Sequence, residues 1–421
     1  MERYSEYKDS GVQWLGEIPG HWKTVRVKAL LSERVDKSDT GLEEPLSMSQ
    51  KYGIIPTKEM DVIPNMASTF IGAKRVFKRD LVFNKLKAHL GVFAISKYDG
   101  LVSPDYAVYT PNERTYLPFM EYVFHTPLYI GEFTRRATGV AIGLTRLYTN
   151  GLFAIPFLYP PIEEQHSIVS YLDDKCGKID KMLEGKQKQI ELLAEMKQRI
   201  IADAVTRGLN PDVKMKATNI PWLPEIPEHW DVKRGKNLFN KEQRPIEEGD
   251  EIVTCFRDGE VTLRKNRRTT GFTEATDYSH YQHICKGDLV IHQMDAFAGS
   301  SGVSDSDGMG TPVLSVCTAR IEGVNHYYFA YILRLMGKNN FILSLYRGIR
   351  ERSSDFRFET FAKQYLPVPP AIEQEQIVKF IHERSSKLDT LTSKLQQEIE
   401  SIKEYKQRLI SDVVTGQIKV C

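Results

Sequence analysis

Two segments of the chain carry apolar residues at the spacing of a helix that buries one face. In the later segment Leu388, Leu395, Ile402 and Leu409 recur every seven residues, and the earlier segment has a similar rhythm. The pattern predicts one long helix at 161–208 and another at 370–421, each of about 45 helical residues and on the order of 65 Å. A helix with one apolar seam needs a partner, and two copies in one chain can supply each other.

We therefore expect an intramolecular pair rather than a dimeric coiled coil. The expected core of this pair consists of Ile179, Met182, Leu193, Ile200, Leu388, Leu395, Ile402 and Leu409.

Each predicted helix has ordinary start and stop signals. A Pro-Pro pair precedes both helices, at 160–161 and 369–370, and Glu163, Glu164 and Glu373 favour the N-terminal end of a helix. Gly208 and Gly416 lie close to where the apolar runs stop.

The remaining segments, 1–160 and 209–369, have the pattern of mixed α/β bodies. Short apolar runs such as DLVF at 80–83 and DLVI at 288–291 follow charged turns and predict strands. Helices are expected around Pro118–Arg136 and His326–Tyr346, at matching places in the two bodies.

The two halves of the chain are copies of one another. WLGEIPGHW at 14–22 and WLPEIPEHW at 222–230 agree at seven of nine positions and hold all four tryptophans. KRDLVFNKLKAHLG at 78–91 matches KGDLVIHQMDAFAG at 286–299 at the same offset of 208, and the long helices match at an offset of 209. Such a repeat indicates duplication of a unit made of a tryptophan motif, a body and a helix.

Composition narrows the class of protein. The chain of 421 residues is 41% hydrophobic and 27% charged with a net charge of +2, so it is expected to fold and to contact nucleic acid only through local basic patches. Its five cysteines are scattered with no CxxC, which argues against a disulfide framework or a zinc site, and no metal site is predicted. Without an apolar run of membrane-spanning length or a signal-peptide core, a cytoplasmic protein is expected.

Three catalytic motifs were sought and none is complete. No Gly-Lys pair, at 177, 185, 235 or 337, is followed by Ser or Thr as in a phosphate-binding loop. Adenine methylation uses a tetrapeptide in which Asn or Asp precedes Pro-Pro and an aromatic residue. The two Pro-Pro pairs of this chain follow Tyr159 and Val368, which have neither an amide nor a carboxylate side chain. Pro104-Asp105 lacks the Glu-x-Lys of a metal-dependent nuclease. We therefore predict no catalytic residues in this chain.

The order and duplication of these motifs resemble those of the specificity subunits of type I restriction–modification enzymes. The resemblance covers essentially the whole chain and rests on GEIPGHW, PPIEEQ, PPAIEQEQ and the helix end KQRIIADAVTRG. It implies an α+β fold, in which two mixed α/β target-recognition domains are joined by two long antiparallel coiled-coil helices in a pseudo-twofold repeat. Its domains would be 1–160 and 209–369, with spacer helices at 161–208 and 370–421.

The resemblance also implies partners. Each recognition domain would read one half of a bipartite, asymmetric site in double-stranded DNA. The helices would set the half-site spacing and bind two modification (methyltransferase) subunits and, through them, the restriction (translocase/endonuclease) subunits. The chain itself would hold no cofactor, and S-adenosylmethionine, ATP and Mg²⁺ would belong to the partners, which carry out adenine methylation or ATP-dependent restriction.

Residues that differ between otherwise matching copies are candidates for base reading. Asn84-Lys85 in the first copy becomes His292-Gln293 in the second, and Lys87 becomes Asp295. Amide and basic side chains suit the edges of bases, although an ordinary exposed strand end would have the same composition. Gly- and Arg-rich segments before the last strand of each body, and a basic hairpin at 256–271, suit phosphate contact, although each can equally be a solvated charged loop.

The complete set of candidate DNA-binding residues is Asn84, Lys85, Lys87, His89, Arg135, Arg136, Thr145, Arg146, Arg264, Lys265, Arg267, Arg268, His292, Gln293, Arg347, Arg350, Arg352 and Arg357. Trp14, Trp22, Trp222 and Trp230, which are identical in both copies, are expected to be structural, as are His21 and His229. Two other readings remain open: a coiled-coil adaptor without sequence-specific DNA binding, and the recognition half of a fused enzyme with unrecognised chemistry.

Overall fold

The computed structural model of the chain describes residues 2–50, 52–62, 69–139, 145–268, 270, 277–345 and 356–420. The chain divides into two compact units, Met1–Gln187 with Gln396–Cys421, and Lys188–Leu395. Helices α4 (Ile162–Arg207) and α9 (Ala371–Val414) each pass from one unit into the other. Each unit therefore contains one body and one segment of each long helix.

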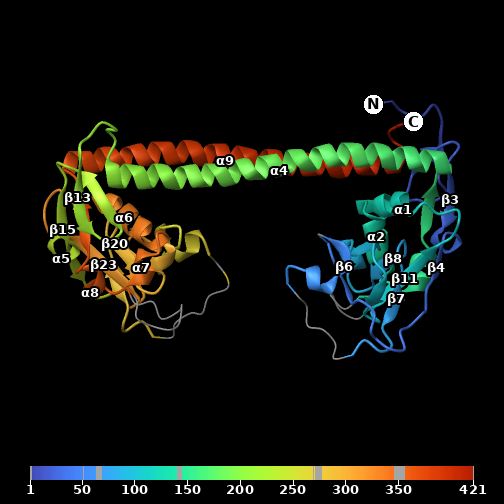
Figure 1. Cartoon of the computed structure of the whole chain (residues 1–421), viewed down its shortest axis with the longest axis horizontal. Helices are drawn as coiled ribbons and strands as arrows, with labels where there is room; N and C mark the ends of the chain where they lie inside the picture. The colour runs from blue at the N-terminus through green and yellow to red at the C-terminus, as the bar shows by residue number, and fades with distance from the viewer. Residues whose placement is uncertain are drawn as a thin grey trace. The chain divides into compact units, whose positions relative to one another are not determined.

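Within each unit the two helix segments are antiparallel. In the first unit Lys406 Nζ lies 2.6 Å from Asp180 Oδ1, and Lys186 pairs with Glu398. In the second unit Lys197 Nζ lies 2.7 Å from Asp389 Oδ1. From Asp180 to Lys197 along α4, the paired residue of α9 changes from Lys406 to Asp389, so the two helices run in opposite directions. The antiparallel pair predicted from the sequence is thus confirmed, and α4 (green) and α9 (red) lie side by side (Figure 1).

Burial along the helix pair is uneven. Leu395 and Leu409 are buried, and five further predicted core residues are half-buried: Ile179, Leu193, Ile200, Leu388 and Ile402. Met182 is 53% exposed, so its prediction as a core residue was wrong. The helix pair by itself leaves most seam residues half-buried, although Leu395 and Ile399 of α9 are buried. The bodies cover the helices near their ends, where the buried residues include Ile168, Leu172, Val205, Ile377, Ile381 and Val413.

Each body is built on a four-stranded antiparallel sheet. The first has the order β4-β11-β8-β9 and the second β16-β23-β20-β21. In the first sheet the strands are β4 (Leu31–Glu33), β8 (Leu81–Asn84), β9 (Phe93–Ile95) and β11 (Tyr106–Pro111). In the second they are β16 (Phe239–Glu242), β20 (Leu289–His292), β21 (Ser301–Val303) and β23 (Leu314–Ala319). The same topology in the same chain order confirms the repeat.

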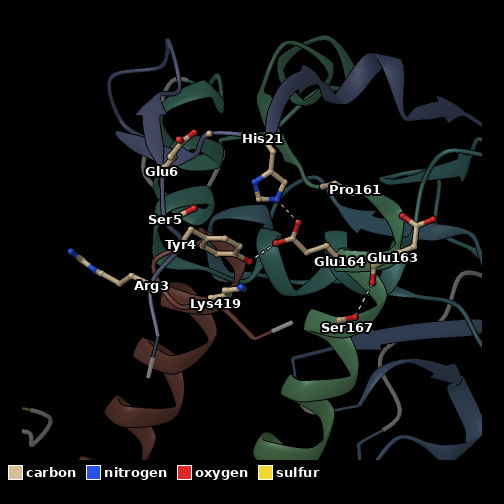
Figure 2. Close-up of a pocket in the computed structure, with 11 residues that line it drawn as sticks. Arg3, Tyr4, Ser5, Glu6, His21, Pro161, Glu163, Glu164, Ser167 and Lys419 are labelled. Atoms are coloured by element: carbon tan, nitrogen blue, oxygen red, sulfur yellow. Dashed lines mark hydrogen bonds and ion pairs between the residues drawn. The ribbon is translucent and has the colours of Figure 1, made fainter.

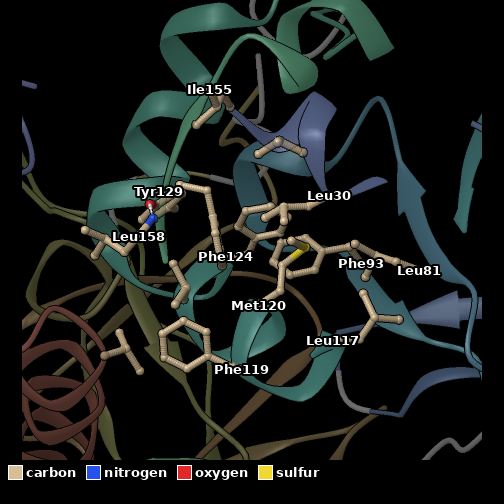
Figure 3. Packing of buried hydrophobic residues seen from close by; sticks show 14 of the residues in the cluster. Leu30, Leu81, Phe93, Leu117, Phe119, Met120, Phe124, Tyr129, Ile155 and Leu158 are labelled. Carbon is tan, nitrogen blue, oxygen red and sulfur yellow. Dashed lines mark hydrogen bonds between the residues drawn. The ribbon is translucent and has the colours of Figure 1, made fainter. Parts of the chain in front are cut away.

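Both faces of each central sheet are covered, which explains the continuous apolar runs of β8 and β20. Leu81 and Phe83 join a large core with the helices of the body and the ends of α4 and α9; Figure 3 shows part of this core, including Leu81. Val82 joins a smaller core on the opposite face. Alternate residues of a strand point to opposite faces, so a doubly covered strand is apolar at every position. In the second unit Ile291 and Val290 divide in the same way.

Paired strands form the smaller core and close each body. The small-core strands are β5 (Leu46–Ser49), β6 (Gly53–Pro56), β7 (Lys74–Val76) and β10 (Gly100–Val102), and in the second unit β17 (Val253–Cys255), β18 (Val261–Leu263), β19 (Gln282–Ile284) and β22 (Gly308–Gly310). The outer pairs join β1 (Tyr7–Asp9) to β2 (Glu17–Pro19), β3 (Lys23–Arg26) to β12 (Pro156–Tyr159), β13 (Met215–Ile220) to β14 (Leu223–Pro227) and β15 (Asp231–Arg234) to β24 (Tyr365–Val368).

The helices predicted inside the bodies are interrupted. The region Pro118–Arg136 forms α1 (Leu117–Phe124) and α2 (Pro127–Arg136), because a proline begins a helix more readily than it continues one. The region His326–Tyr346 forms α6 (His326–Lys338) and α7 (Phe341–Ser344), which Asn340 separates with a φ of 58°. The shorter helices are α3 (Thr149–Phe153), α5 (Gly235–Leu238) and α8 (Phe358–Phe361).

The repeated tryptophans bind the ends of the long helices. Trp22 is fully buried and shares a core with Leu409 and Val413 of α9, and Trp230 is fully buried in a core with Val205 of α4. Gly416 has a φ of 76°, and a Cβ added there would lie 3.2 Å from Trp22 Cη2. Each motif therefore holds the final turn of the helix that begins in the other half of the sequence.

Candidate nucleic-acid interface

Shared polar residues join the start of each long helix to its body. Glu164 Oε2 lies 2.8 Å from His21 Nε2, and the Tyr4 hydroxyl donates to the other carboxylate oxygen (Figure 2). In the second unit Glu373 Oε2 lies 2.8 Å from His229 Nε2. These contacts recur where the sequences agree, and they give both histidines a structural role.

The candidate segment after β8 is a tight turn that Asn84 holds together. Asn84 is 7% exposed, and its Oδ1 accepts hydrogen bonds from the backbone N–H groups of Leu86 (3.1 Å) and Lys87 (3.2 Å). His292 Nδ1 accepts from the N–H of Asp295 at 3.1 Å in the second unit. Short side chains that accept from nearby backbone donors are typical turn residues. The change from Asn84 to His292, predicted to reflect base reading, therefore replaces one turn acceptor by another.

Replacement of Asn84 tests this structural role. The Asn84→Ala variant would remove the acceptor of the Leu86 N–H, while the Lys87 N–H keeps the Asn84 backbone carbonyl, and it is expected to lose about 1–3 kcal/mol in free energy of unfolding. Asn84→Asp keeps an acceptor and is the control, expected to retain most of the stability. Urea unfolding followed by circular dichroism measures both. Wild-type stability with a changed DNA preference in Asn84→Ala would restore the original prediction.

Lys85 and Gln293 occupy equivalent positions on the same backbone frame. Lys85 Nζ lies 3.4 Å from the Pro104 carbonyl oxygen, and Gln293 Nε2 lies 3.4 Å from that of Pro312. Both residues are half-buried. The two units thus present a cation and an amide at one place in a shared scaffold.

The first body gathers basic side chains around Lys85. The N–H of Leu147 donates to the Lys85 carbonyl at 3.0 Å, which brings the segment of Thr145 and Arg146 to the end of β8. Burial lowers the pKa of the Lys74 ammonium, and the charges of Lys85 and Lys37 lower it further. The candidate segments around 84–89 and 145–146 therefore meet near Lys37 and the buried Lys74, and Glu33 and Asp105 offset part of the positive charge there. Lys74 belongs to the basic run AKRVFKRD at 73–80, which is a sequence signal for this place beyond the predicted candidates.

Other candidates of the first body differ in position. Lys87 is exposed and His89 half-buried on the turn and 3-10 helix after β8. Arg135 and Arg136 lie at the end of α2, where both bind the buried carboxylate of Glu132, at 2.7 Å and 2.5 Å. This pairing at a helix end gives both arginines a structural contact that a phosphate would have to displace. Arg146 lies 3.4 Å from Asp105 across exposed surface.

The second body places a basic hairpin beside β20. Arg257, in the turn between β17 and β18, binds Asp295 at 3.0 Å, so the hairpin turn reaches the Gln293 segment. Arg267 binds Asp258 (2.7 Å) and Glu260 (2.9 Å). Lys265 pairs with Glu251. Arg264 is half-buried and Arg268 is exposed. Much of the predicted positive charge is thus balanced locally.

The arginine-rich segment of the second body is described only at its end. Arg347, Arg350 and Arg352 lie outside the described residues, and Arg357 is exposed just before α8. The N–H of Phe356 donates to the Gln293 carbonyl at 2.9 Å, as that of Leu147 does to Lys85. In both units the Gly- or Arg-rich segment therefore leads to the strand end that carries Lys85 or Gln293.

Comparison with known proteins agrees with this architecture. Residues 227–401 match the family model of the type I restriction modification DNA specificity domain. A candidate MjaX specificity subunit of a type I restriction enzyme from Methanocaldococcus jannaschii is 21% identical over 435 residues, covering 96% of each chain. The MjaVIII specificity subunit of the same organism is 23% identical over 62% of this chain and 61% of its own.

Solved structures share the fold. One, from a study of complex assembly and conformational transition of the type I R-M system, has a TM-score of 0.67 at 15% identity and covers 95% of this chain and 99% of that chain. The HsdS subunit from Thermoanaerobacter tengcongensis has a TM-score of 0.51 at 14% identity, with 95% and 98% covered. Among the described helices, none combines the length and apolarity needed to cross a bilayer. Residues 227–401 therefore carry the type I restriction modification DNA specificity domain, and the whole chain shares the fold of the solved structures that it resembles.

Proposed function

We propose that each body of this specificity subunit reads one half of a bipartite, asymmetric site in double-stranded DNA. The proposal rests on one observation at the ends of β8 and β20. The two bodies share the same backbone arrangement there, but the side chains that they present differ in chemistry. Lys85 and Gln293 reach equivalent carbonyl groups, yet one is a cation and the other an amide. A lysine suits guanine or phosphate and a glutamine suits adenine, so two bodies of one fold select different bases.

Phosphate contacts set the register of each body on its half-site. In the first unit Lys37, Lys85 and Arg146 are basic side chains near the end of β8, with the buried Lys74 behind them and Glu33 and Asp105 beside them, within a chain of net charge +2. Such a basic cluster attracts the DNA backbone without making the whole surface a polycation. Base contacts from the neighbouring side chains then distinguish one sequence from another.

The helix pair sets the half-site spacing and binds two modification subunits, through which the restriction subunits join. Support for two equivalent docking sites comes from the repeat, because a duplicated unit presents the same surface twice. One helical turn of DNA, ~34 Å, is the natural scale for the spacing. This chain is proposed to supply no catalytic group and no cofactor, whereas its partners supply S-adenosylmethionine, ATP and Mg²⁺ for methylation or restriction.

Removal of the basic cluster tests the DNA interface. In the assembled complex, Lys85→Ala with Arg146→Ala is expected to weaken binding to a cognate duplex and to reduce the slope of log K against log salt by about 0.9 per lost phosphate contact. Lys8→Ala, which removes an exposed lysine from β1, is the matched control. Fluorescence anisotropy at several salt concentrations measures the slope. An unchanged slope in the double variant, with the complex intact, would remove this cluster from the interface.

A further inference from the structure

The second body brings three ligand-type side chains together across one strand pair. His283 lies in β19, and Cys285 is two residues further on, so the two point to the same face. β22 runs antiparallel to β19 with Gly308 opposite Ile284, which sets Asp307 opposite Cys285. One ligand atom from each of His283, Cys285 and Asp307 lies within 4.8 Å of the other two. No other such group occurs among the residues that the structure describes.

The imidazole is held in an orientation that suits metal binding. His283 Nδ1 lies 2.9 Å and 3.1 Å from the two carboxylate oxygens of Asp250, and the His283 side chain is buried. A hydrogen bond from Nδ1–H to a carboxylate leaves the lone pair on Nε2 and raises its basicity, as in carboxylate–histidine–metal arrangements. Glu247 Oε1 lies 4.0 Å from Nε2, beyond hydrogen-bond distance but compatible with a shared ion between the two atoms.

The first body has an arginine at the position that His283 occupies in the second body. The position of His283 is that of Arg75 at the offset of 208, and the Arg75 guanidinium binds Glu43 at 2.8 Å and Asp36 at 3.0 Å. In the second body an imidazole lies at this position among the carboxylates of Glu247, Asp250 and Asp307. The cation there comes from Arg244, which binds Asp288 beside Cys285.

Asp307 and its counterpart in the first body, Asp99, have the same structural role. Asp99 in the first body and Asp307 in the second each accept a backbone hydrogen bond through Oδ1, from Lys78 (2.7 Å) and Lys286 (2.8 Å). This contact leaves Oδ2 of Asp307 for a ligand bond. Only in the second body do a histidine and a thiol accompany it.

We propose that His283, Cys285 and Asp307 bind one borderline-soft divalent cation of the Zn²⁺ class, with Glu247 or water as the fourth ligand. Mixed nitrogen, sulfur and oxygen donors in a set of four are typical of Zn²⁺. Cys285 binds as the thiolate, and its proton is released to solvent. The ion joins β19 to β22 at the position that Arg75 occupies in the first body. The expectation from the sequence, based on the absence of CxxC, is thereby revised.

Metal titration of the full-length chain tests the proposal. Chain stripped with a chelator is titrated with Co²⁺ and then Zn²⁺, and dialysed protein is analysed for bound metal. We expect one equivalent per chain and a Co²⁺ spectrum with a thiolate charge-transfer band that Zn²⁺ abolishes. Cys285→Ser and Asp307→Asn should lose stoichiometric binding, and the latter keeps the acceptor for the Lys286 N–H. Asp250→Asn should bind about 10–100-fold more weakly because the histidine loses its orienting partner.

Two controls separate the site from general effects. Cys176→Ser, at a free thiol in the first unit, should bind metal as the wild type does. His283→Arg introduces the residue of the first body and should abolish binding while circular dichroism and urea unfolding show an intact fold. Absence of a tight equivalent in the wild-type chain would overturn the proposal. Retention of the charge-transfer band in Cys285→Ser, or of stoichiometric metal in both Asp307→Asn and His283→Arg, would also overturn it.

Discussion

Exchange of the first body for that of a specificity subunit with another target is expected to change one half of the methylated DNA motif and leave the other half intact. The exchange takes residues 23–159, so that β3 and β12, which pair with each other, are replaced together. Trp22 and α4 stay, and so do the contacts of Trp22 with the end of α9, while the incoming body supplies the rest of that core. Because base reading is proposed to reside in the bodies, the gap between half-sites should keep its length.

The matched control exchanges 231–368, which runs from β15 to its partner β24. It should change the opposite half of the motif. Methylome sequencing of cells that express each chimera with the modification subunit reads both results. Alteration of both halves by one exchange would show that the bodies do not read DNA independently.

Truncation of Trp22 is expected to have the largest effect on stability of any single substitution considered. Trp22 is fully buried against the last turns of α9, and Trp→Ala in such a core costs about 3–5 kcal/mol. Trp230→Ala should have the same effect at the end of α4. Urea unfolding by circular dichroism gives the loss, and hydrogen exchange of residues 405–416 should report the loosened helix end in Trp22→Ala.

Two further variants, Trp14→Ala and Trp22→Phe, separate the effect of burying the tryptophan from the effect of the size of its ring. Trp14 is only half-buried, so Trp14→Ala should cost less. Trp22→Phe keeps a large aromatic ring and removes an indole Nε1 that has no hydrogen-bond partner among the described residues, so it should also cost less than Trp22→Ala. Equal destabilisation by Trp14→Ala and Trp22→Ala would contradict the role assigned to the helix contact.

The periodic part of the fold was predictable because its pattern is local. The seven-residue rhythm and the Pro-Pro and Gly boundaries indicate helices close to the observed α4 and α9. Met182 shows the limit of such patterns, since this position of the predicted seam is exposed whereas Leu395 is buried. The sequence does not reveal which parts of the helices the bodies cover, because that depends on tertiary packing.

The location of the candidate site could be predicted from the sequence, but the roles of its individual residues could be predicted less well. Segments around 84–89 and 145–146 are far apart in sequence, yet Leu147 joins them by a hydrogen bond to Lys85. Asn84 and Gln293 both belong to polar positions that differ between copies, but only the structure shows that Asn84 is a turn acceptor. The His283–Cys285–Asp307 group joins residues from two strands, and no spacing motif marks it.

The most direct test of the central claim is the methylome of cells that express the unaltered chain with its modification subunit. The predicted result is one asymmetric motif in two parts, separated by a gap of fixed length and methylated on adenine. Such a motif requires two different readers held at a constant separation. A contiguous or palindromic motif, or none at all with the complex formed and S-adenosylmethionine supplied, would contradict the account and favour a coiled-coil adaptor.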